Sequence, residues 1–281
     1  MGKTKKVSLF LIIGMFLAIM IVFTIYPILY AVIGSFKTNG ELTAGGNFLP
    51  QSGWHYKNYI QAFVQANFAQ YTFNSIVISL STMVIAVITS SLAGFVFARR
   101  KFVGKKFILA LYIGLMFIAL GSVTLYPIYN MLIKFGLSKS IMGLVLALTG
   151  GQAANVLLVM GFVMSIPKEL DEAAIIDGCS IYGIFFRVIM PLIKPILAVV
   201  ALFTFRNAWN DYVTTLIMSI SMPKLKTLTV AVVQLKYSIN AAAEWHIMLA
   251  GASIAIIPIL IVYFFANKQF ISGLTAGAVK G

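Results

Sequence analysis

The sequence predicts an all-α protein that crosses a membrane several times. Of its 281 residues, 60% are hydrophobic and only 10% are charged, and the mean hydropathy is +0.98. Soluble domains are about one-quarter charged, so this composition favours a chain that buries apolar surface in lipid. A helix needs about 20 apolar residues to cross a hydrocarbon core about 30 Å thick, and several charge-free runs of that length are present.

We therefore predict a single transmembrane domain over residues 1–281, with an external loop over residues 37–73, a cytoplasmic loop over 165–195 and a tail over 268–281. The six predicted spans lie at about residues 8–34, 74–98, 107–132, 141–164, 196–220 and 247–267.

The first two spans need separate justification. Lys3, Lys5 and Lys6 before an apolar run are typical of a signal peptide, but this run is too long and lacks a clear cleavage site, so we expect an uncleaved span. Residues 58–72 mix amides with aromatics before the apolar run that starts at Asn74. This mixture favours an interfacial helix ahead of the second span.

The third, fourth and sixth predicted spans contain no charged residue, whereas the fifth contains Arg206 and Asp211. Ionisable side chains inside a membrane are costly and mark a cavity or a paired site.

Basic residues set the predicted orientation, because they accumulate near cytoplasmic ends of spans. They gather at the N-terminus, over Arg99–Lys106, in the 165–195 loop and after residue 267, so both termini are predicted to be cytoplasmic. The same separation into juxtamembrane groups argues against nucleic-acid binding despite a net charge of +14.

Catalytic and metal sites are not predicted. The single cysteine, Cys179, excludes an intrachain disulfide, and His55 and His246 have no acidic or sulfur neighbours at metal-ligand spacing. The chain has no Gly-rich phosphate-binding loop, so we expect no cofactor and no enzymatic activity in this chain.

Four of the seven acidic residues lie close together in the cytoplasmic loop: Glu169, Asp171, Glu172 and Asp177. Ser165 and Pro167 before them and Gly178 after them predict a helix of about 11 residues, with the acids at its positive end. Its predicted face holds Leu170, Ala173, Ala174 and Asp177. On residues alone, the helix could bind a partner or pack under neighbouring spans.

The loop also carries Glu172-Ala173-Ala174, Asp177-Gly178 and Ile189-Met190-Pro191. This pattern resembles the EAA loop of ATP-binding cassette import permeases. Cys179 and Met190 depart from the usual residues with small changes in shape. The resemblance implies that the loop couples to a separate ATPase through Leu170, Glu172, Ala173, Ala174, Asp177, Gly178 and Pro191.

Two further segments resemble the smaller, second permease subunit of maltose-type carbohydrate importers. These are Trp209-Asn210-Asp211-Tyr212 and the ending Gly273-Leu274-Thr275-Ala276-Gly277-Ala278-Val279-Lys280-Gly281. Trp54, Asn58-Tyr59 and Asn74-Ser75 extend the likeness. The resemblance implies that Gly273, Thr275, Gly277 and Lys280 reach towards the ATPase, whereas a disordered end is the plain alternative.

The polar residues of the fifth span have two interpretations. Arg206, Trp209, Asn210 and Asp211 could face a translocation path for a hydroxyl-rich solute, or form a polar bridge to another helix or permease. The resemblance favours the bridge, because solute contacts in that family are expected mainly in the partner subunit.

The resemblance implies a sugar or oligosaccharide importer in the bacterial inner membrane, with a homologous second permease, an ATPase homodimer that binds ATP and magnesium, and an external solute-binding protein. An importer for glycerol phosphate, polyamine or amino acid is the nearest alternative. A self-contained secondary transporter is disfavoured, because internal repeats are not apparent.

Overall fold

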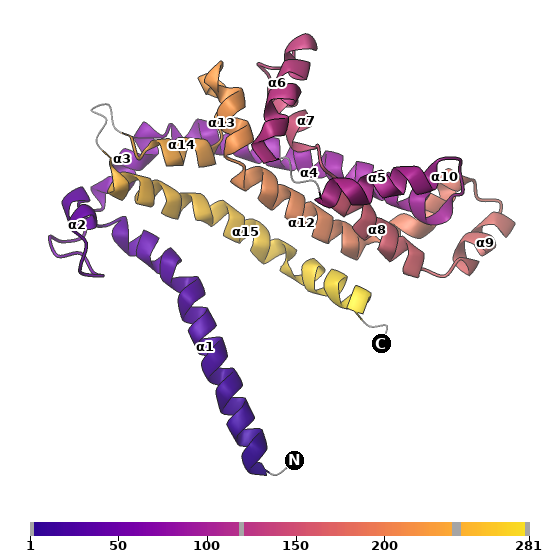
Figure 1. The fold of residues 1–281 in the computed structure, drawn as a ribbon, viewed down its shortest axis with the longest axis horizontal. Coiled ribbons are helices and arrows are strands. Elements are labelled where there is room, and N and C mark those ends of the chain that lie inside the picture. The colour runs from indigo at the N-terminus through magenta and orange to yellow at the C-terminus, as the bar shows by residue number, and fades with distance from the viewer. Residues whose placement is uncertain (1–2, 118–120, 238–242, 279–281) are drawn as a thin grey trace. The chain divides into compact units, whose positions relative to one another are not determined.

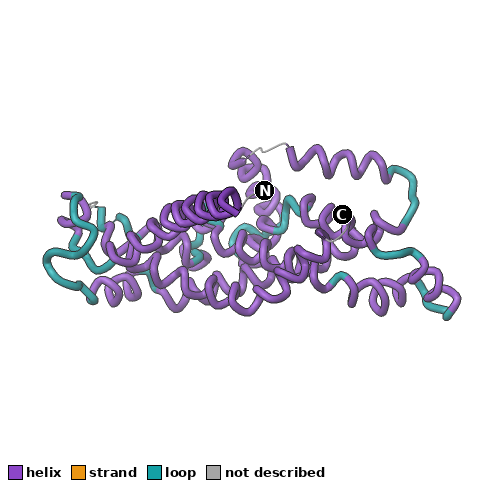
Figure 2. Tube along the Cα trace, turned by 90° about the horizontal axis from the view of Figure 1, so that it is seen from below, coloured by secondary structure: helices purple, strands orange, loops and turns teal. Residues whose placement is uncertain are grey.

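The computed structural model describes residues 3–117, 121–237 and 243–278. Within these ranges the chain forms helices joined by short loops, with no strand beyond one isolated bridge between Tyr237 and Ala243 (Figure 2). The expected all-α class is therefore confirmed for the described residues.

The helices follow one another along the chain, with short 3₁₀ and π segments between them (Figure 1). They are α1 (Lys3–Gly34), α2 (Asn39–Ala44), α3 (Lys57–Gln65), α4 (Phe68–Arg99), α5 (Lys105–Phe117), η1 (Gly121–Thr124), α6 (Leu125–Lys134), α7 (Ile141–Leu148), α8 (Ala153–Ser165), α9 (Glu169–Ile176), α10 (Ile181–Gly183), η2 (Ile184–Ile189), α11 (Met190–Leu192), α12 (Lys194–Asn210), α13 (Val213–Ile220), η3 (Pro223–Leu225), α14 (Leu228–Gln234) and α15 (Trp245–Ala278).

The chain divides into two compact units, residues 1–69 with 231–257 and residues 70–230 with 258–281. In the first unit, buried Asn58 donates to the carbonyls of Ser35 and Lys37 at 2.8 and 2.9 Å. Asn39 donates to the Ala243 carbonyl and accepts from the Trp245 N–H. These side-chain bonds hold the end of α1, the start of α2 and the start of α15 together.

Glu41 organises the loop after α1. It forms a capping box with Thr38 at the start of α2, and its other carboxylate oxygen accepts N–H groups from Gln51 and Ser52 at 2.7 Å. Hydrogen bonds to the ionised form, that from the Thr38 backbone first, lower the pKa of Glu41 to about 2. The carboxylate therefore stays charged and keeps this loop folded at neutral pH.

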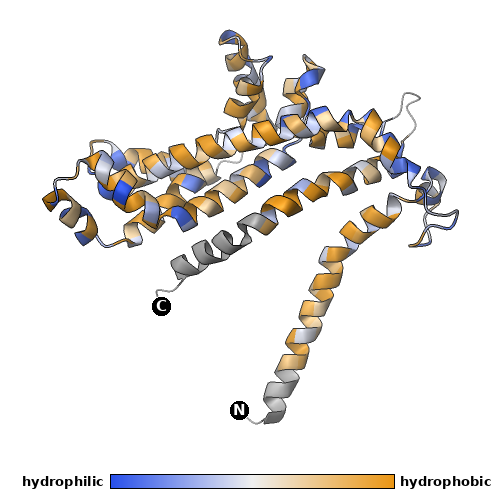
Figure 3. Cartoon of the chain, turned by 180° about the vertical axis from the view of Figure 1, so that it is seen from behind, coloured by the Kyte–Doolittle hydropathy of each residue, from blue (hydrophilic) through white to orange (hydrophobic). Residues whose placement is uncertain are grey.

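In the second unit, α8 packs beside α5 and α12, and α9 lies at one end of this group of helices (Figure 1). Its core contains Phe95 of α4, Val159 and Val163 of α8 and Val199 and Val200 of α12. Hydrophobic residues run along α4, while hydrophilic residues concentrate towards the α9 end (Figure 3). This end holds the loop singled out from the sequence.

The structure confirms a multi-span membrane protein. Within the described residues, three helices are long and apolar enough to cross a membrane, over Phe10–Gly34, Phe68–Arg99 and Trp245–Phe264, and up to five spans result if two bent helix pairs each count once. Side chains along α1 are exposed, including Phe10 at 78% and Phe23 at 73%, which suits contact with lipid or a partner chain.

The span boundaries differ from expectation in two places. The predicted interfacial helix over 58–72 is the shorter α3, and α4 begins at Phe68 rather than at residue 74, because Asn67 adopts a left-handed φ of 45° that ends one helix just before the next. The predicted third span divides between α5 and α6, with residues 118–120 outside the described residues and a positive φ at Gly121.

The predicted fourth and fifth spans are each broken. The pair Ile141–Leu148 and Ala153–Ser165 bends by 58° at Gly150 and Gly151, where Gly151 has a φ of 74° that glycine adopts without strain. The fifth divides into α12 and α13 at Asp211 and Tyr212. Apolar composition predicted the lengths of these segments but could not show where their helices break.

Candidate functional site

The cytoplasmic-loop helix expected from the acidic cluster is present as α9, over Glu169–Ile176. It has 8 residues rather than about 11, because its first turn begins after Pro167 and Lys168 instead of at Ser165. Three acids, Glu169, Asp171 and Glu172, occupy the first turn, where the helix dipole favours negative charge. The acidic residues therefore stabilise the start of the helix.

Gly178 ends α9 as expected, through a specific cap. Its φ is 78°, its N–H donates to the Ile175 carbonyl at 3.0 Å, and the Cys179 N–H donates to the Ala174 carbonyl at 2.9 Å. Two such bonds around a left-handed glycine form a Schellman motif. The motif fixes how the chain leaves α9.

The predicted face of α9 is corrected at Ala174. Ala174 is 7% exposed and packs in the core with Val163, Ile184 and Ile189, whereas Ala173 and Asp177 are exposed. Ala174, a small residue in the middle of this short helix, holds the helix against its own chain. Ala174 thus seats α9 in this unit and does not present a surface to a partner.

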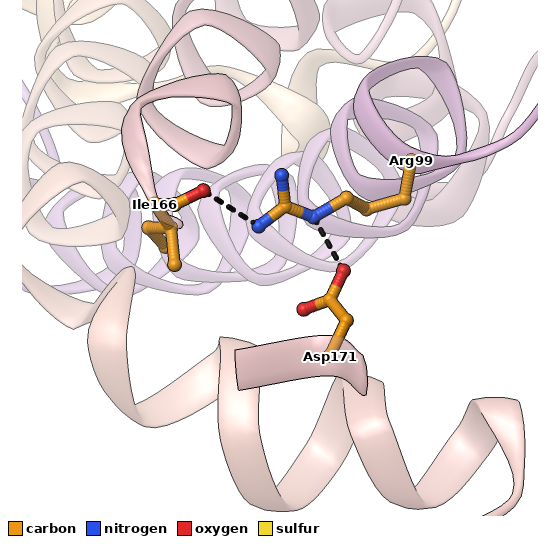
Figure 4. Close-up of polar contacts among 3 residues, drawn as sticks. All are labelled: Arg99, Ile166 and Asp171. Atoms are coloured by element: carbon orange, nitrogen blue, oxygen red, sulfur yellow. Dashed lines mark hydrogen bonds and ion pairs between the residues drawn. The ribbon is translucent and has the colours of Figure 1, made fainter. Parts of the chain in front are cut away.

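One arginine joins three helices at this end of the unit (Figure 4). Arg99, in the last turn of α4, forms an ion pair with Asp171 of α9, with 2.7 Å between Nε and Oδ2, and its Nη2 donates to the Ile166 carbonyl that follows α8 at 2.9 Å. The Arg99 side chain is 5% exposed and that of Asp171 is 16% exposed. This bridge links the start of α9 to two long helices.

The segment after α9 returns to the bundle through a π stretch. Phe185 and Ile189 are buried in the same core, while Phe186 is exposed, so the apolar side chains of this segment are divided between the core and the surface. The chain bends sharply near Pro191, since the axis turns by 76° between Ile181–Leu192 and α12. The 165–195 loop therefore forms a short helical projection, which we call the knob.

The knob carries apolar side chains that its own chain leaves uncovered. We call this set the knob surface; it consists of Leu170 (43% exposed), Ile175 (60%), Ile176 (86%), Tyr182 (74%) and Phe186 (58%). Exposed acids, Glu169, Glu172 and Asp177, lie on the same short segment. Exposed apolar residues beside charged ones are typical of a binding surface. Sequence reasoning singled out Leu170 but missed the two isoleucines, whose exposure depends on which side of α9 faces the core.

The proposed path residues of the fifth span do not share one surface. Trp209 is 2% exposed and stacks on Phe205 at 5.8 Å, and its carbonyl accepts a hydrogen bond from Thr229. It therefore belongs to the packed interior of the unit, which does not favour the interpretation in which Trp209 faces a path. Arg206 and Asn210 are exposed, and Arg206 donates to Asn207 at 3.3 Å.

Asp211 caps a helix. Its Oδ1 accepts from the N–H and the hydroxyl of Thr215 at 2.9 and 3.0 Å, and its Oδ2 accepts from the Thr214 hydroxyl at 2.9 Å. A side-chain cap of this kind is worth about 1 kcal/mol. The Asp211 carboxylate is thus satisfied by the first turn of α13.

A polar cleft of about 250 Å³ lies beside these two helix breaks. We call it the central cleft; its lining residues come from α4, the fourth-span break, α8 and α12, with polar side chains Thr82, Gln152, Asn155, Thr204, Asn207 and Asp211. Asn155 donates to Gln152 and, at 3.2 Å, to the Thr204 hydroxyl. Of the predicted path residues, only Asp211 lines this cleft.

The tail residues lie only partly within the described chain. Gly273, Thr275 and Gly277 lie in the continuing helix α15, while Lys280 lies outside the described residues. In the part of the chain that the structure describes, no group of three or more His, Cys, Asp or Glu residues is arranged to hold a metal ion.

The chain was compared with known proteins. The family model described as "Binding-protein-dependent transport system inner membrane component" matches residues 87–275, which include the knob and most of the central cleft. The chain belongs to this family. The expected class, an importer permease of the bacterial inner membrane, is thereby confirmed.

Several curated proteins match this chain over nearly its whole length. It is 32% identical over 267 residues to the probable ABC transporter permease protein YurM of Bacillus subtilis, covering 95% of this chain and 87% of YurM. It is 32% identical to the maltodextrin transport system permease protein MdxG of the same species, covering 95% of each chain. It is also 32% identical to the galactooligosaccharides permease protein GanQ, covering 99% and 98%.

A solved structure shows the same fold. A chain of a bacterial ABC transporter involved in the import of the acidic polysaccharide alginate superposes with a TM-score of 0.79 at 20% identity, covering 96% of this chain and 99% of that chain. The overall arrangement of the helices is therefore also found in a chain of that transporter.

Proposed function

We propose that this chain is one permease subunit of an ATP-driven importer that moves a sugar or oligosaccharide across the bacterial inner membrane. The support comes from full-length relatives whose names specify maltodextrin, galactooligosaccharides and arabinooligosaccharides. The expected resemblance to carbohydrate importers agrees with these names.

The knob surface is the observation that carries the coupling part of this proposal. Leu170, Ile175 and Ile176 expose apolar area on a short helix that is fixed by the Gly178 cap and the Arg99 ion pair. Apolar groups that protrude on a rigid support fit a cleft on another protein. We assign α9 as the element that docks on the ATPase, with Glu172 and Asp177 in the charged rim of the contact.

The bridge to α4 and α8 gives the coupling a physical route. Because Arg99 holds Asp171 and the end of α8 together, a push on α9 moves the ends of two helices as one body. ATP and magnesium would be bound by the ATPase, and nucleotide-driven closure of that dimer would displace α9 towards the partner permease. The resulting movement of α4 and α8 would open the path for the solute.

The membrane topology and the subunit composition of the assembly are part of the same proposal. Six spans with both termini in the cytoplasm fit the distribution of basic residues. The assembly would contain a second, homologous permease, an ATPase homodimer below and an extracytoplasmic solute-binding protein above. The exposed apolar residues of α1, such as Phe16 and Phe23, provide surface for lipid or for that second permease.

A solute of another class is the second candidate. The sulfoquinovosyl glycerol transport system permease protein SmoH of Agrobacterium fabrum is 32% identical over 266 residues. A relative at the same level of identity is therefore named for a charged glycoside. Transport assays with neutral and anionic glycosides separate the two.

Pull-down from detergent-solubilised membranes tests the docking assignment. We expect Glu172→Lys and Gly178→Asp to reduce the recovered ATPase at least tenfold while the second permease still copurifies. Glu172→Lys reverses a charge on the docking segment, and Gly178→Asp forces an L residue into a conformation that costs about 1–2 kcal/mol.

Glu244→Lys is the control, because it makes the same charge change outside the loop. Recovery of the ATPase at wild-type levels with both loop variants would contradict docking through α9. A wild-type chain that transports solute without copurifying subunits would overturn the importer assignment.

We also propose that the end of the chain reaches the ATPase. In the described part, α15 continues as a helix through Gly273, Thr275 and Gly277 to Ala278, so the segment has a continuous support from the membrane span. Deleting residues 273–281 should lower solute-stimulated ATP hydrolysis several-fold in the assembled complex without changing subunit recovery. Unchanged hydrolysis in that complex would show that the tail has no coupling role.

A further inference from the structure

The central cleft lies where helices are interrupted near their middles. Gln152 follows the Gly150–Gly151 break between α7 and α8, and Asp211 follows the end of α12 before α13. Thr82 comes from near the middle of the 32-residue α4. Three segments predicted to span the membrane thus bring polar groups to one cleft at a similar distance from their ends.

Broken helices at membrane depth require a reason, because interrupted backbone leaves polar groups that hydrocarbon cannot satisfy. Such breaks are tolerated where they line a water-filled cavity or a binding site. Here the fourth-span break presents the N-terminus of α8 to the cleft at Gln152, Ala154 and Asn155. The geometry is that of a polar site within the membrane-spanning part of the chain.

Thr82 gives independent evidence that the cleft binds a ligand. Its side chain is 1% exposed, it lines the cleft, and its hydroxyl has no hydrogen-bond partner in the described chain. Leaving a buried hydroxyl without a partner is unfavourable. A hydroxyl group of a bound solute would provide that partner.

The chemistry of the lining selects the ligand class. Three amides and two hydroxyls line the cleft, and the Asn155–Gln152 pair does not use the Asn155 Oδ1 or the Gln152 Nε2. The single carboxylate, Asp211, is engaged by Thr214 and Thr215, and no Lys or Arg side chain lines the cleft in the described residues. Amides and hydroxyls without a cation fit hydroxyl groups of an uncharged solute better than a carboxylate or phosphate.

We propose that the central cleft is a subsite for the hydroxyl groups of a neutral sugar ring during passage, contributed by this subunit itself. The inference rests on the proposed importer function and deepens it. A volume of about 250 Å³ is smaller than the roughly 300–1,000 Å³ of pockets for drug-sized ligands, so the cleft takes one part of an oligosaccharide while the rest lies elsewhere along the path.

Thr82→Val tests the subsite with an isosteric change. The complex with its ATPase and binding protein is placed in proteoliposomes, and uptake of maltotriose, arabinotriose and galactotriose is measured at saturating binding protein. Removing a hydrogen bond to the moving solute should lower the uptake rate of the transported sugar about five- to tenfold. Thermal stability should stay the same or rise, because valine removes an unpaired buried hydroxyl.

Ser79→Ala is the matched control. Ser79 lies on the same helix, is also buried with an unpartnered hydroxyl, and does not line the cleft. We expect it to leave uptake unchanged.

Direct occupancy is measured by maleimide labelling of Ala154→Cys in a Cys179→Ser background, because Ala154 is exposed in the cleft. The transported sugar should slow this labelling at least threefold.

Wild-type uptake by Thr82→Val together with labelling that sugar does not slow would overturn the subsite alone. A wild-type complex that takes up none of the three sugars would overturn the sugar-importer proposal and the subsite with it.

Discussion

Arg99→Met should release α9 from the helix bundle and uncouple ATP hydrolysis from transport. The change removes the only charge paired with Asp171 among the described contacts and also leaves the Ile166 carbonyl without its donor. Removing one partner of a buried ion pair costs about 3–5 kcal/mol, and we expect the lower end because Asp171 keeps 16% of its surface exposed. Solute-stimulated hydrolysis should fall at least tenfold.

The double variant Arg99→Met with Asp171→Leu distinguishes charge burial from lost contact. Replacing both members of a buried pair by apolar residues is often neutral, so the double variant should recover most of the stability that the single variant loses. A double-mutant cycle on the temperature of half-inactivation gives the interaction between the two side chains.

Arg100→Met serves as the control, because Arg100 is the next residue and its side chain is exposed. If Arg99→Met and Arg100→Met had the same small effects on hydrolysis and heat resistance, the ion pair would have no part in holding α9.

Gly94→Ala should separate α4 from α8. A Cβ at Gly94 would lie 2.7 and 2.8 Å from Cγ1 and Cβ of Val159 and 3.0 Å from the Met160 backbone nitrogen. The Val159 Cβ and the backbone nitrogen cannot move by rotamer change, so the two helices must shift. Small residues allow such close approach between membrane helices. Overpacking of this kind costs about 1–3 kcal/mol.

Gly161→Ala on α8 provides the comparison for Gly94→Ala. A Cβ there meets nothing within 4 Å, so alanine should stabilise the helix by up to about 1 kcal/mol through its better helix propensity. Heat resistance of the purified complex should therefore change in opposite directions for the two variants. A stabilising Gly94→Ala would mean that α4 and α8 are less tightly packed than described.

Much of the structure of the 165–195 loop could be predicted because its signals are local. Acids at a helix start and a glycine at its end each act within a few residues, so α9 and the Gly178 cap are where the sequence predicted them. The side of α9 that faces the core was not predictable, since it depends on Phe95, Val163 and Ile184 from other helices.

The central cleft was largely missed for a related reason. Thr82, Gln152 and Thr204 are ordinary polar residues in apolar segments, and no short spacing joins them. The pair Gly150–Gly151 was an available signal for a break in the fourth span. Trp209, by contrast, was prominent in the sequence but packs on Phe205 in the interior.

By itself, the sequence determined the membrane class, the helical composition, the family and the place of the helix in the 165–195 loop, because hydropathy and capping residues act through composition and near neighbours. Only the tertiary structure decided that Arg99 joins Asp171 and that Thr82 meets the breaks at Gln152 and Asp211. These contacts depend on how distant helices pack, and packing between helices is set by the shapes of many side chains at once rather than by any local pattern.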